Sequence, residues 1–194
     1  MHLFYTPDIN PTHPQYFLTE EESKHAIRVM RLEVGSAVQL IDGKGGLYTA
    51  EIIDAHPKRT ILQIKNTTQG YNRRNHYLHI AIAPTKNMER LEWFLEKATE
   101  IGIDEISLII CQRSERKEAK TERLNKIITA AIKQSLKAYH PKLNEVMPLA
   151  ELLGKPFDGQ KFMAHCEDSE KVTLASTLQK HSRYLILIGP EGDF

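Results

Sequence analysis

The chain has little cysteine and no long apolar run. Its two cysteines, Cys111 and Cys166, stand far apart in 194 residues. Two isolated thiols exclude a disulfide framework and a cysteine-rich metal site, and they are typical of proteins of the reducing cytoplasm. No apolar run approaches the roughly 20 residues of a membrane-spanning helix, and the first residues lack a signal-peptide pattern. We therefore expect a cytoplasmic protein that is not embedded in a membrane.

The chain also lacks an excess of charge of either sign. It has 26 Lys and Arg residues against 25 Asp and Glu residues, and its formal net charge is +1. A globally basic nucleic-acid-binding protein is therefore excluded, and any surface for RNA has to be a local patch. The nine histidines are scattered, and the motifs of zinc proteases, dinucleotide-binding proteins and serine hydrolases are absent. We expect no metal site.

The first domain is predicted to span residues 1–70 and to be rich in β-structure. Apolar alternation predicts strands at 37–41, 47–53 and 60–65. The segment 42–46, Asp-Gly-Lys-Gly-Gly, indicates a turn because glycine adopts positive φ without a steric penalty. Thr19 is expected to cap a short helix before these strands. The elements together predict a small β-barrel.

The second domain is predicted to span residues 75–194 and to alternate strands with helices. Strands are expected at 77–83, 106–110, 161–166 and 184–188, and helices at 88–101, from Thr121 to before Pro141, and around 172–180. Gly102 is expected to end the helix at 88–101. This alternation predicts a mainly parallel sheet that is covered on both faces.

Two loops follow strands of the second domain and are candidates for chemistry, because ligands of parallel sheets bind beyond the carboxyl ends of the strands. One loop is Gly189-Pro-Glu-Gly192, whose glycines allow close approach to the backbone. The other contains Arg113 and Arg116, which could bind phosphate or stabilise negative charge on a reacting base. On pattern alone, an ordinary strand-end turn explains the first loop better than a ligand site does. A solvated charged loop explains the second equally well.

Basic residues cluster on the short helix of the first domain, at Lys24, His25, Arg28 and Arg31. Such a cluster on a small β-module fits an RNA-backbone footprint. The pair Arg73-Arg74 either joins this patch or keeps the linker solvated. The end of the long helix carries cations that its dipole favours whatever the function, and its polar Gln134 and Ser135 face either solvent or a site.

Several segments together resemble one family, the RsmE-type 16S rRNA (uracil-N3)-methyltransferases of the SPOUT superfamily. The matching segments, in chain order, are His25, Val29, Arg31 and Gly35, the turn Asp42-Gly43, Lys97-Ala-Thr-Glu-Ile-Gly-Ile103, Arg113-Ser114, Gln134-Ser135 with Pro141, and Ile188-Gly-Pro-Glu-Gly192. They run across essentially the whole chain. Each match is modest alone, but the ordered set is specific.

The resemblance implies a fold and a function. It implies an α/β protein with an N-terminal PUA-like β-barrel that grips RNA and a C-terminal domain with a trefoil knot, working as a homodimer. It implies that S-adenosylmethionine is the methyl donor and that the substrate is a uridine N3 of 16S rRNA in the small ribosomal subunit. The residues carried over to the cofactor site are Leu187, Ile188, Gly189, Pro190, Glu191 and Gly192, with His165 and Glu167 as further candidates.

The chemistry needs a uracil that has lost its N3 proton, because protonated N3 is a poor nucleophile. Arg113 is the first candidate to stabilise the resulting negative charge, and Ser114 would orient it or the base. Glu100 could accept the proton, while Lys97 and Gln134 could position the nucleotide. For Lys97 and Glu100 the alternative is an ordinary charged helix face.

The chain departs from the family pattern in two places. It has Asp193 where the family has a second glycine, a change expected to matter little unless that position requires positive φ. The family also continues beyond this loop through a segment that threads the knot and completes the cofactor pocket. Because that segment is absent here, we expect the chain to be a fragment of a longer protein, with weak or no cofactor binding and no turnover by itself.

Two other functions stay open. One is a non-catalytic RNA-binding protein that kept the barrel and the basic patch. The other is a knot-type methyltransferase that acts on a different RNA or a different atom.

Overall fold

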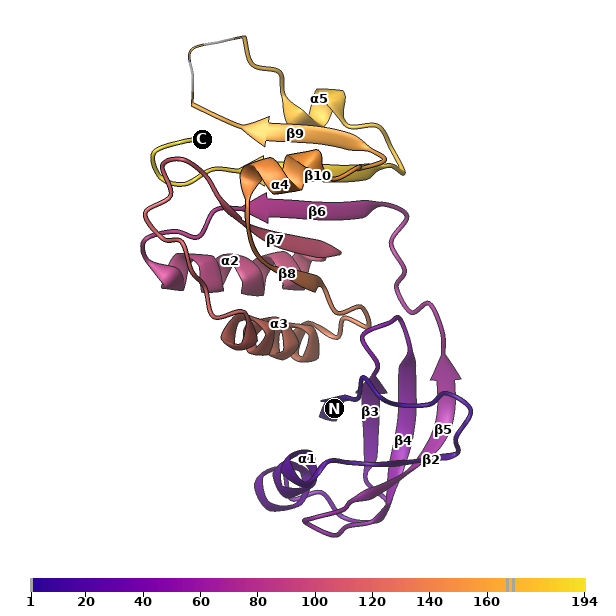
Figure 1. The fold of residues 1–194 in the computed structure, drawn as a ribbon. Coiled ribbons are helices and arrows are strands. Elements are labelled where there is room, and N and C mark those ends of the chain that lie inside the picture. The colour runs from indigo at the N-terminus through magenta and orange to yellow at the C-terminus, as the bar shows by residue number, and fades with distance from the viewer. Residues whose placement is uncertain (1, 167, 169) are drawn as a thin grey trace. The chain divides into compact units, whose positions relative to one another are not determined.

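A computed structural model describes residues 2–166, 168 and 170–194 (Figure 1). The chain forms two compact units. The first contains the chain up to Arg73 together with Ile132–His140, and the second contains Arg74–Ala131 and Pro141–Phe194. In this described part of the chain, no helix is both long and apolar enough to cross a membrane.

The first unit is built on a five-stranded sheet with the order β1-β3-β4-β5-β2. Its strands are β1 (His2–Tyr5), β2 (Gln15–Phe17), β3 (Ala37–Ile41), β4 (Leu47–Asp54) and β5 (Ile61–Thr68). The pairs are antiparallel except β1 with β3. The three predicted strands are confirmed, whereas β1 and β2 were not predicted because each is only three or four residues long. Alternate residues Tyr48, Ala50 and Ile52 of β4 face the core, as the period of a strand requires.

The predicted turn at 42–46 is confirmed, and a buried carboxylate organises it. The Asp42 side chain accepts hydrogen bonds from the amides of Lys44 and Gly46, at 2.7 and 2.8 Å, and from the Tyr48 hydroxyl at 3.0 Å. A Cβ atom at Gly46 would lie 2.3 Å from the Asp42 carboxylate. Glycine is therefore required here for close approach.

The segment 132–140 completes a small apolar cluster of the first unit. Ile132 and Ala138 are buried there together with Leu3 and Ile41. The amide of Gly45 donates to the carbonyl of Ala138 at 2.9 Å. The core of the first unit thus includes residues that lie more than sixty positions beyond its last strand.

The predicted short helix is confirmed but has an unexpected second half. Helix α1 (Glu20–Lys24) starts at Thr19, whose hydroxyl accepts a hydrogen bond from the Glu22 amide at 3.3 Å. It continues as a π-helix over His25–Val29. The chain leaves this segment through Arg31, which adopts a positive φ of 56°. A π-helix is rare and is frequently found at functional sites. A positive φ is uncommon for a residue other than glycine.

The second unit is a five-stranded sheet in the order β8-β7-β6-β10-β9, and every pair is parallel. The strands are β6 (Tyr77–Ile82), β7 (Glu105–Ile110), β8 (Lys142–Pro148), β9 (Gln160–Ala164) and β10 (Arg183–Ile188). The helices are α2 (Met88–Ile101), α3 (Thr121–Ser135), α4 (Leu149–Gly154) and α5 (Leu174–Thr177).

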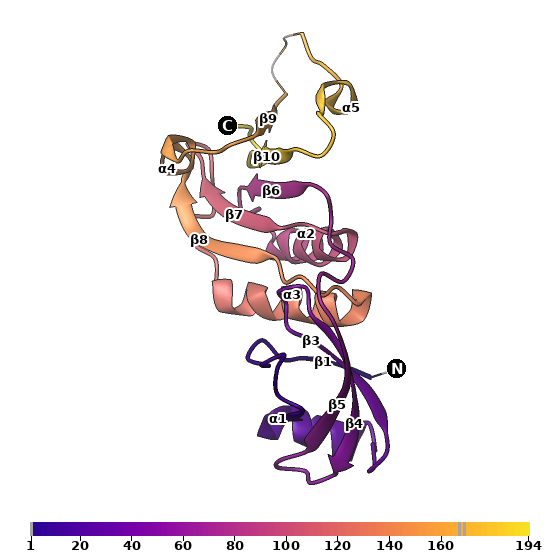
Figure 2. The ribbon, with the colours of Figure 1, turned by 90° about the vertical axis from the view of Figure 1, so that its right-hand side faces the viewer.

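Helices cover both faces of this sheet, as predicted. Figures 1 and 2 show α2 on one side and α4 on the other. Leu91 and Leu95 of α2 pack on Ile106 and Leu108 of β7. Leu152 of α4 packs on the opposite face, where Leu185 and Leu187 of β10 are also buried.

The boundaries of the strongly periodic elements were predicted well. The helix at 88–101 is confirmed, and Gly102 ends it with a φ of 120°. The predicted helix at 172–180 is wrong in extent, because only α5 (Leu174–Thr177) is helical there. Strand β8 was missed because its polar and charged residues conceal an edge strand.

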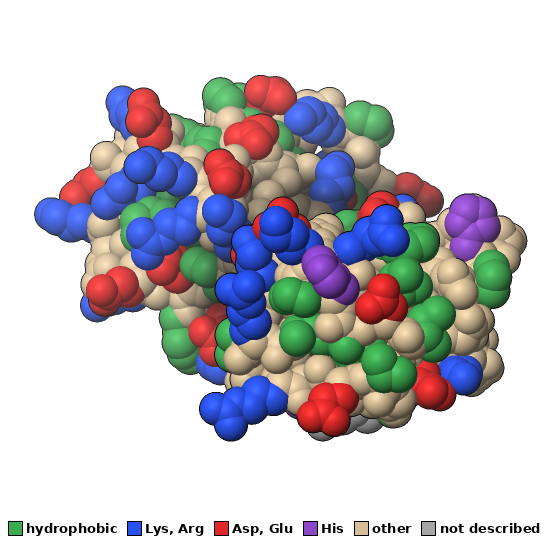
Figure 3. Space-filling view, turned by 90° about the horizontal axis from the view of Figure 1, so that it is seen from below, with side chains coloured by type: hydrophobic (Ala, Val, Ile, Leu, Met, Phe, Trp, Pro, Cys, Tyr) green, Lys and Arg blue, Asp and Glu red, His purple; other side chains and the backbone are tan. Residues whose placement is uncertain are grey.

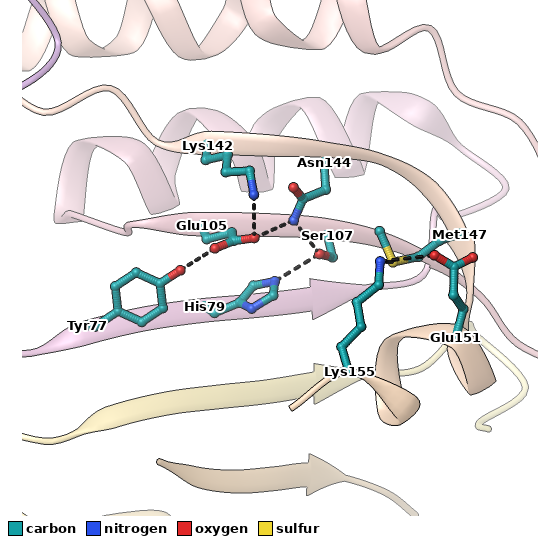
Figure 4. Close-up of polar contacts among 9 residues, drawn as sticks. All are labelled: Tyr77, His79, Glu105, Ser107, Lys142, Asn144, Met147, Glu151 and Lys155. Carbon is teal, nitrogen blue, oxygen red and sulfur yellow. Dashed lines mark hydrogen bonds and ion pairs between the residues drawn. The ribbon is translucent and has the colours of Figure 1, made fainter. Parts of the chain in front are cut away.

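Polar side chains from three strands form a hydrogen-bonded network on the α4 face of the sheet (Figure 4). The Asn144 amide donates to Glu105 at 2.6 Å and to the Ser107 hydroxyl at 2.8 Å. Ser107 is also 2.8 Å from the Nε2 atom of His79. The Tyr77 hydroxyl donates to Glu105. Because His79 and Ser107 are buried, these bonds replace the water that the groups lose on folding.

The carboxyl group of the network stays ionised although it is partly buried. Burial alone would raise the pKa of Glu105, but hydrogen bonds from Asn144 and Tyr77 outweigh it and lower this pKa below its ordinary value. Burial lowers the pKa of His79 below the ordinary 6.5; Glu105 opposes this shift, while Lys142 and Arg183 add to it. His79 is therefore neutral in the folded protein near neutral pH.

We expect this histidine to make the second unit less stable in mild acid. Below a pH of about 6.5, the unfolded chain binds a proton at His79 that the folded chain does not, so the free energy of unfolding decreases as pH falls. His79→Gln should lose less of this free energy between about pH 7.5 and pH 5.5. Urea unfolding followed by the fluorescence of Trp93, the single tryptophan and a residue of α2, measures this difference.

His13→Gln, at an exposed histidine of the first unit, is the control. An equal pH dependence in His79→Gln and in the parent protein would contradict the assignment.

Candidate active site at the carboxyl edge of the parallel sheet

Five loops leave the parallel sheet at one edge, because parallel strands all end on the same side. Three of them carry predicted site residues. Arg113 and Ser114 follow β7, Gly189–Gly192 follow β10, and His165 follows β9. The sheet order places β10 between β6 and β9. The loop after β10 therefore lies between the loops after β6 and β9.

The structure brings Arg113 and the glycine-rich loop together. The guanidinium Nη1 of Arg113 donates to the carbonyl of Gly192 at 2.7 Å. Ser114 is buried, and its hydroxyl accepts a hydrogen bond from the Cys111 amide at 2.9 Å. The Ser114 amide donates to the Cys111 carbonyl at 3.1 Å. Ser114 therefore closes the turn that presents Arg113 at the edge.

A second set of bonds fixes Glu191 of the same loop. The Lys86 amide, just after β6, donates to the Glu191 carboxylate at 3.0 Å. Hydrogen bonds from the Glu191 amide and from that of Lys86 lower the pKa of this carboxyl group. Arg116 donates to the Lys86 carbonyl at 3.0 Å. The loops after β6, β7 and β10 are thus connected, and Glu191 stays exposed and negatively charged.

Asp193 occupies a position that requires positive φ, here 68°. Asp is among the few non-glycine residues that adopt this conformation readily. Its side chain adds bonds that glycine lacks, because it accepts from the amides of Cys166 at 2.7 Å and of Phe194 at 2.9 Å. These two bonds lower the pKa of Asp193. The substitution of glycine by Asp193 is therefore tolerated and ties the loop after β10 to the one after β9.

The remaining predicted cofactor residues differ in what they offer to a ligand. Leu187 and Pro190 are buried, and Ile188 packs against the core under α2, so these three contribute shape and backbone. His165 has a buried Nδ1 atom without a hydrogen-bond partner among the described residues. Glu167 lies outside the described residues. The exposed Glu191 carboxylate, the backbone of Gly192 and the imidazole Nδ1 atom of His165 together suit a ligand that has both a cation and hydroxyl groups.

The structure does not bring Lys97 and Glu100 to this edge. Helix α2 begins after β6 and runs back toward the start of β7, so its last turn lies at the opposite edge of the sheet. There the Lys97 ammonium contacts Glu96 at 2.7 Å and Glu100 at 3.1 Å. Within one chain, these residues form a charged helix face far from Arg113.

The predicted basic patch lies on the first unit. Lys24, His25 and Arg28 line a hollow of about 430 Å³ together with Lys133, a residue of α3 that sequence analysis did not select. Lys133 contacts Glu22 at 2.9 Å, and Lys24 contacts Glu20 at 2.7 Å. Figure 3 shows several Lys and Arg side chains next to one another near the middle of its view, with Asp and Glu side chains among them.

The other predicted RNA-binding residues have separate surroundings. Arg31, Arg73 and Gln134 are exposed, and Ser135 is half-buried. Arg74 instead forms an ion pair with Asp104 at 2.6 Å inside the second unit. Because Asp104 also accepts from the Leu78 amide at 2.7 Å, this pair anchors the start of β6. Its geometry indicates a structural role for Arg74.

Two functional features were missed. Lys86 and Asp193 connect the loops of the site through hydrogen bonds to and from the backbone. The position of Lys86 soon after a predicted strand could have indicated the first. Across the described residues, no group of three His, Cys, Asp or Glu side chains could hold a metal ion.

Comparisons with known proteins agree with this architecture. The family model described as "RNA methyltransferase domain" matches residues 72–194, and "RNA methyltransferase PUA domain" matches residues 18–65. The chain is 27% identical to the ribosomal RNA small subunit methyltransferase E of Bacillus subtilis, over 92% of this chain and 75% of that protein.

Two solved structures share the fold. The "probable rRNA-methyltransferase" of Porphyromonas gingivalis is 36% identical, with a TM-score of 0.90 over 100% of this chain and 82% of that one. A Legionella pneumophila protein described as a methyltransferase in complex with the bound cofactor SAM is 25% identical. Its TM-score is 0.84 over 99% of this chain and 81% of that one.

We expect the side chain of Asp193 to hold the loop after β9. Asp193→Ala removes the acceptor of the Cys166 amide. Because one hydrogen bond contributes about 1 kcal/mol net, hydrogen exchange of that amide should become about fivefold faster. Asp193→Asn keeps an acceptor and tolerates positive φ, so exchange should change little. Amide exchange measured by NMR tests both variants.

Asp158→Ala, an exposed aspartate before β9, is the control. Equal exchange rates in Asp193→Ala and the parent protein would show that the bond does not protect the loop.

Proposed function

Because the chain belongs to the RNA methyltransferase family, we propose that it transfers a methyl group from S-adenosylmethionine to N3 of a uridine in 16S rRNA of the small ribosomal subunit. The observation that carries this proposal is the hydrogen bond between Arg113 and Gly192. It joins an arginine suited to a reacting anionic base with a glycine-rich loop suited to a cofactor. An rRNA substrate implies a cytoplasmic protein.

The proposed cofactor site is the edge between the loops after β9 and β10. The backbone of Gly189–Gly192 would line it, since a Cβ atom at Gly192 would meet only the aliphatic part of Arg113, at 3.5 Å. Glu191 and His165 would supply hydrogen-bond partners for the polar groups of the cofactor, and Leu187, Ile188 and Pro190 would shape the floor. When bound, S-adenosylmethionine supplies a methyl group that its sulfonium makes an activated electrophile.

Arg113 would do the main work on the base. A uracil that has lost its N3 proton carries negative charge on O2 and O4, and a fixed guanidinium stabilises that charge. The bond to Gly192 uses one of the five guanidinium N–H donors, so four stay available for the base. Ser114 acts as a positioning residue, because it holds the turn from Cys111 that carries Arg113. The remaining requirement is alignment of the nucleophile with the methyl group.

Lys97 and Glu100 have a role in this proposal only through a homodimer. Glu100 lies at the far end of α2 from Arg113, so a second copy would have to supply it as the proton acceptor. The exposed face of α2 includes Trp93 and Ile101, whose side chains are 64% and 81% exposed. Large exposed apolar side chains on one helix are typical of an interface.

The first unit would grip the RNA backbone. Lys24, His25, Arg28 and Lys133 line one hollow, and Arg31, Arg73 and Ser135 are further candidates for contacts. Phosphate contacts of this kind contribute affinity without reading sequence. The uridine would therefore be selected at the site around Arg113.

Replacing the arginine of the site should abolish most of the turnover. In the complete protein, we expect Arg113→Ala to reduce the methylation rate by about 10²-fold or more, with little change in cofactor affinity, because the side chain acts on the base. Transfer of labelled methyl groups to small-subunit rRNA and calorimetry with S-adenosylmethionine measure the two effects.

Arg123→Ala, an exposed arginine paired with Glu92 on the same unit, is the matched control. If Arg113→Ala turned over as fast as the parent protein, Arg113 could not be the residue that stabilises the charge of the base.

The basic patch should determine the salt dependence of RNA binding. Each of Lys24→Gln and Arg28→Gln should lower the slope of log affinity against log salt concentration by about 1, because one phosphate contact is lost. Fluorescence anisotropy with a labelled 16S rRNA fragment measures this slope. Lys58→Gln, at an exposed lysine of the same unit, should leave it unchanged. An unchanged slope in both patch variants would exclude the patch as the footprint.

A further inference from the structure

Arg183, the first residue of β10, has no role in the site described above. Its guanidinium lies 3.9 Å from the centre of the Tyr77 ring and 5.7 Å from that of Phe157. In the described part of the chain, no carboxylate or carbonyl accepts a hydrogen bond from this guanidinium. An arginine that two rings orient and no acceptor neutralises is prepared to bind an anion.

The loop before β9 passes close to Arg183 at Gly159. Gly159 has a φ of 155°, and a Cβ atom there would lie 2.4 Å from the Arg183 carbonyl and 2.8 Å from the Phe157 ring. Only glycine therefore lets the backbone pass so close to Arg183.

A cavity of about 250 Å³ opens next to Arg183 on the α4 face of the sheet. Its charged lining consists of Arg183, Lys142, Lys155 and one carboxylate, Glu105. Glu105 is already bonded to Tyr77, Asn144 and Lys142 (Figure 4). Lys155 is paired with Glu151 at 2.9 Å, so Arg183 is the cation of this lining that has no carboxylate partner among the described residues.

Part of the lining, called the apolar wall below, consists of apolar side chains. It is formed by Met147, Leu152, Phe157 and Leu185. Polar side chains of the sheet, His79, Ser107 and Asn144, also line the cavity and bond to one another (Figure 4). These bonds are already made without a ligand. A ligand would gain most from an oxyanion at Arg183 combined with an apolar body against the wall.

We propose that this cavity is a binding site for a small organic anion, with a carboxylate or phosphate monoester at Arg183 and an apolar body against Met147 and Leu152. Arg183 and Tyr77 start β10 and β6, whereas the candidate active site follows the ends of these strands. The proposed anion-binding residue is thus separated from the candidate active site by the length of β10. This proposal does not rest on the methyltransferase function.

NMR titration of the protein with phenyl phosphate and with benzoate tests the site. Both probes share one aromatic body, so the tighter of the two identifies the oxyanion class. The Arg183 Nε–Hε signal should shift on binding, while the amide signals of Gly189, Glu191 and Gly192 should not. Arg183→Gln should weaken binding at least tenfold. Arg59→Gln is the matched control, because Arg59 also lies over a ring, that of Phe17 at 5.6 Å, in the other unit.

Other probes can overturn the proposal. Equal binding of the neutral benzamide would exclude an anion site, and equal binding of inorganic phosphate would exclude a role for the apolar wall. Equal weakening by Arg183→Gln and Arg59→Gln would indicate non-specific attraction and overturn it as well. If Arg183→Gln does not fold, Lys155→Gln decides the matter: at least threefold weaker binding supports the site, and unchanged affinity overturns it.

Discussion

The parallel pairing of β10 between β6 and β9 is the constraint on which the second unit depends. Each residue from Tyr184 to Ile188 has a partner on both neighbouring strands. Because all three strands point the same way, their loops emerge at one edge and can hydrogen-bond to one another. Lys86, Glu191 and Asp193 make these connections. The same pairing places Arg183 and Tyr77 side by side at the other edge.

How much of this could be predicted depended on the length and periodicity of each element. Helix α2 and strand β3 were predicted with their observed bounds, because their apolar residues repeat at a clear period. Strands β1, β2 and β8 were missed because short or polar strands gain their stability from pairing with distant segments. That pairing depends on the whole sheet, and a local pattern does not contain it.

The candidate active site also contains features that the sequence predicted and features that it did not. The order of strands and helices predicted that Arg113 and Gly189–Gly192 would share an edge, and their contact bears this out. The same order of strands and helices implies that α2 runs antiparallel to the strands, which places its last turn away from Arg113. Lys97 and Glu100 were nevertheless assigned to the site, because their residue types and motif resembled the family. The requirement for positive φ at Asp193 could not be predicted, because Asp is compatible with either sign of φ. The network around Glu105 was missed because its members are single polar residues in three separate strands.

The division of the chain also affects the order in which it folds during synthesis. Ile132 and Ala138 belong to the buried cluster that contains Leu3 and Ile41, although residues 74–131 separate them from the first sheet. A ribosome adds about 5–20 residues per second, so the first sheet waits several seconds for these partners. Until they emerge, Leu3 and Ile41 are exposed to other nascent chains and to chaperones. The N-terminal unit is thus made first but completed late.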